Sequence, residues 1–463
     1  MPIASPVDLL VVMKEDVVGE RVVYSRLRDL PVSTWAWFAL FFVLYYAAFR
    51  WYPHVGLLDR VVGGDLSFWL GTWALEPNSM VTGRLAENAV GGLFSDGMSL
   101  GLQGAYTRQF GLAGWVLTVP AYATGGFSAA GVGVMVSLVS ALSAVIASGS
   151  VLLTRRALGR GAAVLLGLAL LLPWCVAIAR SMYWTIGIKA LPAVVLIWVM
   201  RSPRRSLVRV LVWSFALTVL AALSGYEYFT VVAATQAAVL AYFSVLERWP
   251  VRQTVVWLAS LVGSVLAGFI AALGVHVVQL YLRAGDFSRI EELKRSALSR
   301  TGVGGSAENA VSLGDATAVT PASVLDYYLG VPVLGVEKSL PLIQQFTVGT
   351  LVLLTAVVII IGLGRHSRSA ALLREQALGV AWFVSLIGPL GWFLLARPHS
   401  VMHTFMNVSL WFLPTIPLAL ALLWPPIRRS VGAVARRPLP WLWILLVALA
   451  LLVSFAYSQV TVR

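Results

Sequence analysis

Two carboxylates, Glu76 and Asp96, lie in one long polar stretch of an otherwise apolar chain. A carboxylate beside a reacting hydroxyl can take its proton as a general base. Both residues also allow a structural interpretation, because Glu76 can cap a helix or pair with Arg84, and Asp96 stands in a Ser-Asp-Gly turn sequence. We therefore keep Glu76 and Asp96 as candidate bases, and we interpret Asp65, in Gly-Gly-Asp, as a turn residue.

A second group of polar residues is basic and lies near the ends of hydrophobic segments. Arginine, lysine and histidine in such places can bind a phosphate and stabilise its charge as it departs. The candidates are Arg84, Arg108, Arg180, Lys189, Arg397, His399 and His403, with Tyr106 beside them. Arg108 can instead snorkel towards lipid headgroups. Arg180 and Lys189 flank a short aromatic stretch and can simply mark the membrane interface.

Further candidates lie inside hydrophobic segments. Glu227 stands between two tyrosines, and an acid within a membrane segment indicates function by default, although the tyrosines could hold it as structure. We interpret His276 as a packed or interfacial histidine. His399 and His403 are four residues apart without a nearby carboxylate, so a divalent cation is only weakly supported. We assign no metal ligand and no certain cofactor.

The composition places these residues in a membrane protein. Of 463 residues, 59% are hydrophobic and 12% are charged, whereas a soluble protein carries roughly 25% charged residues. These values exclude disorder, a coiled coil and a water-soluble enzyme of this size. The hydrophobic blocks can each cross a hydrocarbon core of about 30 Å. The sequence therefore predicts an all-α polytopic membrane protein of about 11 transmembrane helices. They are expected at 34–52, 129–153, 162–179, 187–200, 207–223, 228–246, 254–281, 342–363, 377–396, 405–424 and 440–457.

Basic loops set the expected orientation. The loops 154–160, 201–209, 247–252, 364–374 and 425–438 are rich in arginine, and such loops stay in the cytoplasm. We expect 1–33 to be a cytoplasmic segment and 34–463 to form one transmembrane domain. Two large extracytoplasmic loops, 53–128 and 282–341, then carry most of the acids, and we expect interfacial helices in them. The net charge of +14 is explained by the orienting loops, so we expect no nucleic-acid partner.

Two segments of these outer loops need their own interpretation. The segment 111–126 is apolar but is interrupted by Pro120, and a full crossing there would move the basic loop 154–160 outside. We interpret it as a helix in the outer interface, with a true span as the alternative. The segment 302–318 is rich in glycine, alanine and serine, and we predict that it is mobile without ligand.

The first outer loop resembles that of the GT-C membrane glycosyltransferases, most closely the branch of protein O-mannosyltransferases and lipid A aminoarabinose transferases. By position, Glu76 falls on the family's acidic motif, Arg84 on its helix arginine and Arg108 near its phosphate-contacting lysine. Tyr106, Leu112 and Trp115 fall on its aromatic and apolar positions. The segment 401–422 resembles the family's late motif, with Pro414 and Pro417 on its two prolines and Arg397, His399 or His403 near its basic position.

Two departures from the family pattern stand out. The acidic pair is here Leu75-Glu76, and Phe110-Gly111 replaces two prolines. The resemblance nevertheless implies a GT-C-like fold, and the missing carboxylate speaks mildly against a metal ion. Because nucleotide sugars are absent outside the cell, the implied donor is a polyprenyl-phosphate-linked sugar. The acceptor would be a glycan, a lipid or a protein.

Other functions remain open at this point. A polymerase or ligase of polyprenyl-diphosphate glycans would use arginine and histidine in a late loop and would need no acid after the first span. A lipid or solute transporter would place charges deep in several spans and would show inverted repeats, which we do not find. For each of these functions we expect a multi-pass protein of a bacterial inner (plasma) membrane. For a transferase, the active site would be extracytoplasmic.

Overall fold

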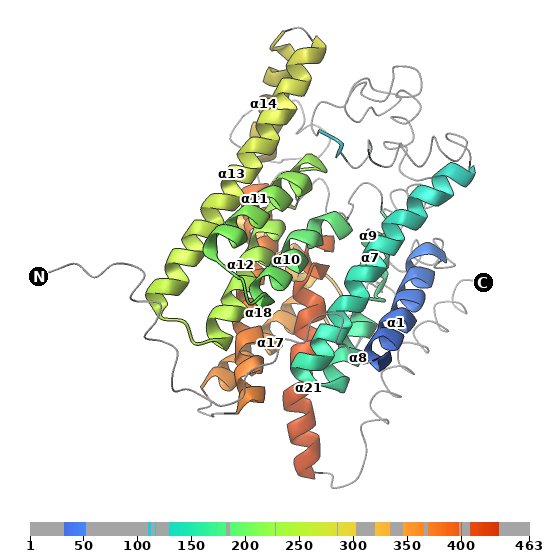
Figure 1. The fold of residues 1–463 in the computed structure, drawn as a ribbon, viewed down its shortest axis with the longest axis vertical. Helices are drawn as coiled ribbons and strands as arrows, with labels where there is room; N and C mark the ends of the chain where they lie inside the picture. The colour runs from blue at the N-terminus through green and yellow to red at the C-terminus, as the bar shows by residue number, and fades with distance from the viewer. Residues whose placement is uncertain are drawn as a thin grey trace, which may run out of the picture.

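The computed structural model describes residues 32–51, 110–112, 116, 129–181, 186–226, 228–284, 286–301, 320–333, 346–364, 369–397, 400 and 408–434. This part of the chain is helical, and its only extended pairing is an isolated bridge between Pro332 and Thr347. The helices form a bundle, beyond which α14 (Ser288–Thr301) projects (Figure 1). The predicted all-α fold is confirmed for these residues.

The remaining elements follow in chain order. They are α1 (Val32–Trp51), α7 (Ala129–Leu158), α8 (Arg160–Ala169), α9 (Pro173–Arg180), α10 (Ile186–Arg201), α11 (Leu207–Leu223), α12 (Phe229–Leu246), α13 (Val251–Ala284), α15 (Pro321–Gly330), α17 (Val348–Leu363), α18 (Ala370–Leu395), the 3-10 helix η6 (Ser409–Phe412) and α21 (Thr415–Val434).

The bundle has two chemically different ends. At one end Arg155 of α7 lies over the ring of Trp37 in α1, and Arg205 pairs with Glu247. We call this the arginine-rich end, defined by the loops 154–160, 201–209 and 247–252. At the opposite end Arg50 of α1 donates a hydrogen bond to Ser137 of α7. We call this the far end, defined by the C-terminal residues of α1, α9 and α11 and by the turn 224–228.

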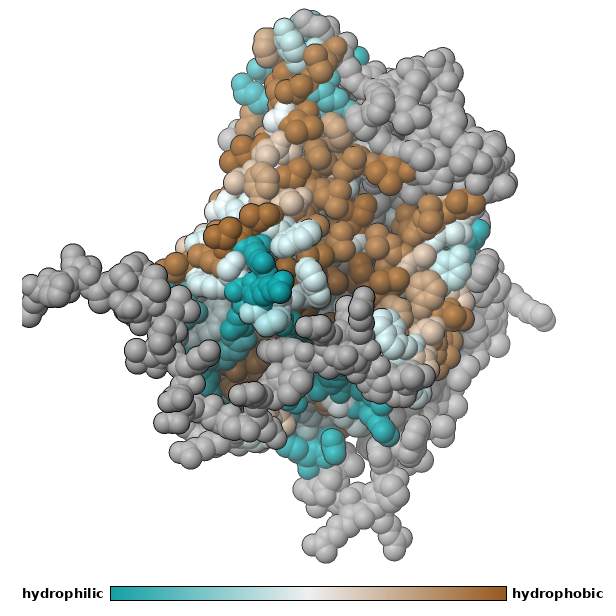
Figure 2. Space-filling model, in the orientation of Figure 1, coloured by the Kyte–Doolittle hydropathy of each residue, from teal (hydrophilic) through white to brown (hydrophobic). Residues whose placement is uncertain are grey.

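The surface of the bundle is that of a protein embedded in lipid. Four helical segments are long and apolar enough to cross a membrane: Gly133–Leu158, Phe229–Leu246, Val251–Leu282 and Ala370–Leu395. Large apolar side chains point outward, including Ile270 and Leu353, which are 65% and 67% exposed. Figure 2 shows apolar side chains over much of the face formed by α13, α10 and α7. Such a large apolar surface fits a bilayer. The chain is a helical membrane protein, while the count of 11 spans stays a prediction.

The predicted span 162–179 is divided in the structure. α8 ends at Ala169 and α9 begins at Pro173, with a turn between them. Proline at the first helical position has no N–H to donate, which favours a new helix start there. Tyr45 of α1 donates a hydrogen bond of 3.1 Å to the carbonyl of Gly167, which satisfies one group beside the break. Hydropathy alone could not show this break, because both halves are apolar.

The observed helices also differ from other predicted segments in their ends. From residue 408 on, the segment predicted as 405–424 contains η6 and α21, and α21 continues to Val434 into the predicted basic loop. The predicted outer loop 282–341 contains α14 and α15. Four of the predicted segments lie wholly or mostly outside the described residues and stay predictions: the span 440–457, the segment 111–126, the N-terminal segment 1–31 and the stretch 302–318.

The helix α13 is longer than a bilayer needs. At 1.5 Å per residue its 34 residues extend about 51 Å, compared with a hydrocarbon core of about 30 Å. The helix is therefore long enough to reach beyond the apolar layer, and its far end leads into the polar α14. Asp286 lies at this junction and accepts a hydrogen bond of 2.9 Å from the backbone N–H of Ser288, at the start of α14.

The start of α14 should loosen at acid pH. The hydroxyl and the N–H of Ser288 both donate to Asp286, and these hydrogen bonds hold the pKa of its carboxyl below the ordinary aspartate value. The stabilisation is therefore present above about pH 3.9 and is lost as the pH falls through the lower pKa of the folded protein. We expect Asp286→Asn to speed amide exchange in the first turn of α14 several-fold at pH 6.

Repeating the comparison at low pH tests whether the negative charge of Asp286 causes the difference in exchange rate. At a pH below the lowered pKa of Asp286 the wild type is itself protonated, so the ratio of exchange rates between variant and wild type should approach one. The matched control is Asp326→Asn on α15, an exposed aspartate whose substitution should leave α14 unchanged. An equal ratio at both pH values would contradict the assigned role of Asp286.

The helices that build the far end are held by close packing and by buried polar pairs. Gly388 of α18 lies against α12, where an added Cβ would meet the backbone of Val231 at 2.8 Å. Between α11 and α12, Gln236 accepts from Ser214 at 2.6 Å and donates to Thr218 at 3.1 Å. Small residues and interhelical hydrogen bonds are the usual means of fixing helices within a membrane. They fix α11, α12 and α18 relative to one another.

Candidate functional site

Two arginines lie at the far end. Arg180 is the last residue of α9 and is only 8% exposed, and Arg50 lies in the last turn of α1. Ser143 of α7 donates a hydrogen bond of 2.7 Å to the carbonyl of Ala179, which holds the end of α9 against α7. The positive charge of Arg50 adds to that of Arg180 at this end of the bundle. Two guanidinium groups at the same end of the bundle are favourable for binding an anion there.

Lys189 lies one element further along, in the first turns of α10. It is 3% exposed, and its Nζ donates to the carbonyl of Ala221 at 2.7 Å and to the carbonyl of Gly225. The carbonyl of Ala221 belongs to the last turn of α11, where backbone acceptors lack intrahelical partners and a cation is favoured, and Gly225 lies in the turn after the helix. Lys189 therefore binds both the last turn of α11 and the turn that follows it. Its burial is greater than a residue marking the interface needs.

The turn 224–228 has an unusual backbone. Gly225 has φ of 149°, and Tyr228 has φ of 68° and ψ of 12°. The left-handed region is uncommon for an aromatic residue, and it costs about 1–3 kcal/mol unless the surroundings enforce it. Tyr228 is buried, accepts a hydrogen bond of 3.4 Å from Ser409 of η6, and packs edge-on against Trp392 of α18. The turn thus joins Lys189 on one side to α18 and η6 on the other.

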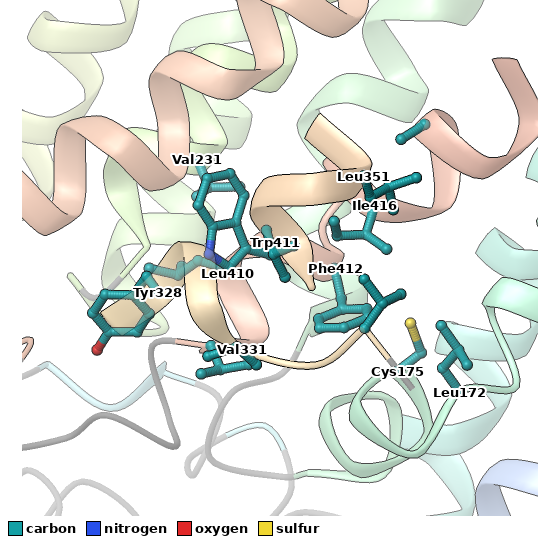
Figure 3. Packing of buried hydrophobic residues seen from close by; sticks show 14 of the residues in the cluster. Leu172, Cys175, Val231, Tyr328, Val331, Leu351, Leu410, Trp411, Phe412 and Ile416 are labelled. Carbon is teal, nitrogen blue, oxygen red and sulfur yellow. The ribbon is translucent and has the colours of Figure 1, made fainter. Parts of the chain in front are cut away.

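Arg397 follows the end of α18 and is partly exposed at the same end of the bundle. The chain beyond it is fastened by Tyr328 of α15, whose hydroxyl donates a hydrogen bond of 2.6 Å to the carbonyl of Ser400. Tyr328 stacks on Phe393, with 3.9 Å between ring centroids, and Phe393 packs against Trp411. Figure 3 shows Trp411 on the side of Tyr328 and Phe412 on the side of Cys175. This aromatic cluster holds the segment that carries Arg397.

A neutral polar group completes the far end. Tyr226 Oη and His276 Nδ1 of α13 are 2.8 Å apart, and Phe110 packs edge-on against the imidazole. Phe269 packs edge-on against the ring of Tyr226. Gln279, one turn beyond His276, is nine-tenths buried, and neither its amide oxygen nor its amide nitrogen has a hydrogen-bond partner. The far end thus carries a cationic part and a neutral, aromatic-lined part.

Three of the residues selected from the sequence can be placed. The structure puts Arg180, Lys189 and Arg397 at the far end, as the predicted orientation of the helices requires. Eight others lie outside the described residues: Glu76, Arg84, Asp96, Tyr106, Arg108, Glu227, His399 and His403.

Sequence reasoning missed Arg50, Tyr226 and Gln279, and it interpreted His276 as a packed or interfacial histidine. A signal for Arg50 was present, because it is an arginine in the last turn of the predicted first span, at the same end as Arg180. Gln279 gave no comparable signal, because the burial of one face of α13 is set by its neighbours.

A metal ion is not indicated by the placed residues. Within the described ranges, no three histidine, cysteine, aspartate or glutamate side chains gather where they could share an ion. A small pocket lies instead at the arginine-rich end, where Gly362, Gln376 and Pro426 line it beside the ion pair of Glu375 with Arg429. This pocket therefore lies at the end of the bundle opposite the candidate site.

Comparison with known proteins identified no relative of this chain. No family model, no curated protein and no solved structure matches this chain. The chain is therefore described by its own fold and chemistry, as a helical membrane protein with a cationic and aromatic far end.

Proposed function

We propose that the protein is an integral membrane glycosyltransferase, which moves a sugar from a polyprenyl-phosphate donor to a glycan, lipid or protein acceptor. The observation that carries this proposal is the gathering of Arg50, Arg180, Lys189 and Arg397 at the end of the bundle opposite the arginine-rich loops. Arginine-rich loops stay in the cytoplasm. The far end then faces the extracytoplasmic side, where the headgroup of a carrier lipid is available.

The proposed reaction needs a carboxylate to take the proton of the acceptor and cations to stabilise the departing phosphate. The acceptor hydroxyl attacks the anomeric carbon of the sugar, the bond from that carbon to the phosphate oxygen breaks, and a carboxylate takes the hydroxyl proton. Glu76 is the proposed base, with Asp96 as the second candidate. The departing phosphate gains charge, which Arg50 and Arg180 would stabilise. Arg84, Arg108, His399 and His403 would add to this phosphate site. The resemblance of the first outer loop to GT-C transferases supports the same assignment.

Removal of the proposed bases tests the function directly. We expect Glu76→Gln or Asp96→Asn to lower transfer from a polyprenyl-phosphate sugar by about 100-fold or more, the usual contribution of a general base. Transfer would be measured in detergent with radiolabelled donor lipid. Asp65→Asn is the matched control, because Asp65 lies in the same outer loop as an expected turn residue. Full activity in both base variants would overturn the assignment, and it would favour a polymerase or ligase that needs no acid in this loop.

A transporter remains the second candidate because of the divided helix α8–α9. Broken helices near the middle of a membrane are typical of transporter binding sites. The break here is lined by apolar residues such as Leu170 and Leu172, with Cys175 just beyond it. Flux of a labelled lipid across proteoliposomes without any acceptor-dependent transfer would favour this second function.

A further inference from the structure

The buried face of α13 changes character along its length. The residues that face the bundle are Leu261, Val265, Gly268 and Ala272, and the same face then continues with His276 and Gln279. The spacing of three and four residues keeps all of them on one side of the helix. An apolar contact face thus becomes a polar one at the level where the turn 224–228 meets α13.

This polar end of the face is not explained by packing. His276 is fully buried, and its Nδ1 is held by the hydroxyl of Tyr226. Gln279 is 9% exposed and leaves both amide groups without a hydrogen bond. A buried amide without partners costs free energy that an apolar side chain of similar size would not. We therefore expect this site to bind a group that forms hydrogen bonds with the amide.

The chemistry of the cluster selects a neutral ligand. A phenol, an imidazole and a primary amide offer both donors and acceptors, which match paired hydroxyl groups, whereas a phosphate needs donors or cations. The rings of Phe110 and Phe269 add apolar surface against which the C–H face of a sugar can pack. Tyr226 directly follows Gly225, whose carbonyl binds Lys189, so the neutral cluster adjoins the cationic part of the site.

We infer that Tyr226, His276 and Gln279 form a subsite for the hydroxyl-bearing sugar of the lipid-linked donor, separate from the arginines proposed for its phosphate. This inference rests on the proposed transferase function. It assigns recognition of the sugar to α13 and to the turn 224–228. It therefore predicts that these residues affect binding of a glycosylated lipid without affecting binding of the same lipid without sugar.

Equilibrium binding in detergent tests this separation. The probes are decaprenyl phosphate and its mannosyl, glucosyl and arabinosyl derivatives, measured with wild type, Gln279→Leu and Tyr226→Phe. We expect Gln279→Leu to weaken binding of the best-bound glycosylated lipid about 10-fold or more, since a site left with unpaired polar groups discriminates strongly. Binding of decaprenyl phosphate should stay within two-fold. Gln253→Leu makes the same substitution on α13 near the arginine-rich end and should change neither affinity.

The outcomes separate the two proposals. If Gln279→Leu and Tyr226→Phe weaken both kinds of lipid equally, or neither, the sugar subsite is overturned while the transferase stands. A Gln279→Leu protein that unfolds at a higher temperature with unchanged affinities would show that the amide is only an unpaired structural group. A wild type that binds all four lipids equally also overturns the subsite. A wild type that binds none of the lipids would overturn the transferase proposal, and this inference with it.

Discussion

Lys189→Met should lower the free energy of unfolding by about 3 kcal/mol, because it removes two hydrogen bonds made by a charged donor to buried carbonyls. Methionine fills a similar volume but leaves the carbonyls of Ala221 and Gly225 without a partner. The cost should appear as a lower midpoint of unfolding in detergent, followed by circular dichroism. The matched control is Lys294→Met on α14, where the side chain is 64% exposed, and we expect a change within about 0.5 kcal/mol there.

The same variant distinguishes two roles for Lys189. If the lysine acts by shaping the turn 224–228, transfer and stability should fall together, because Tyr226 and Tyr228 would lose their fixed positions. Lys189→Arg should recover only part of both, since the planar guanidinium does not fit a site built for an ammonium group. A large loss of transfer with unchanged stability would instead mean that Lys189 touches the substrate.

Arg50→Gln combined with Arg180→Gln should nearly abolish transfer. Removing one preorganised donor from a developing negative charge usually costs about 10²–10³-fold in rate. Both arginines lie at the far end, so we expect each single variant to lose about 100-fold and the double variant to lose more. The measurement is transfer from the polyprenyl-phosphate sugar, together with binding of decaprenyl phosphate, which should weaken in parallel.

The control for the double variant lies at the opposite end. Arg156→Gln removes an arginine from the loop 154–160 and should leave transfer within about two-fold of the wild type, since surface substitutions remote from a site have small effects. The unfolding temperature must be compared for every variant. Normal binding of decaprenyl phosphate by a folded double variant would contradict the placement of the phosphate at Arg50 and Arg180.

The sequence already indicated which residues share the far end. The order of apolar blocks and basic loops predicts which end of each helix faces the cytoplasm. This prediction places Arg180, Lys189 and Arg397 at the same, opposite end. It also predicted most helices of the described residues, because long apolar runs leave few alternatives in a membrane. The break between α8 and α9 escaped this reasoning, since Pro173 divides a run that remains apolar on both sides.

The sequence by itself determined the class of the protein, most helices of the described residues and the end at which Arg180, Lys189 and Arg397 lie. Those properties depend on local composition and on the order of the blocks. Only the tertiary structure decided which face of each helix is buried and what Lys189, Tyr226 and Gln279 meet there. These helices are apolar on all sides, so the pattern that marks the core face of a soluble helix is weak in them. The partners of Lys189 and Tyr226 come from other segments, 32 to 50 residues away along the chain.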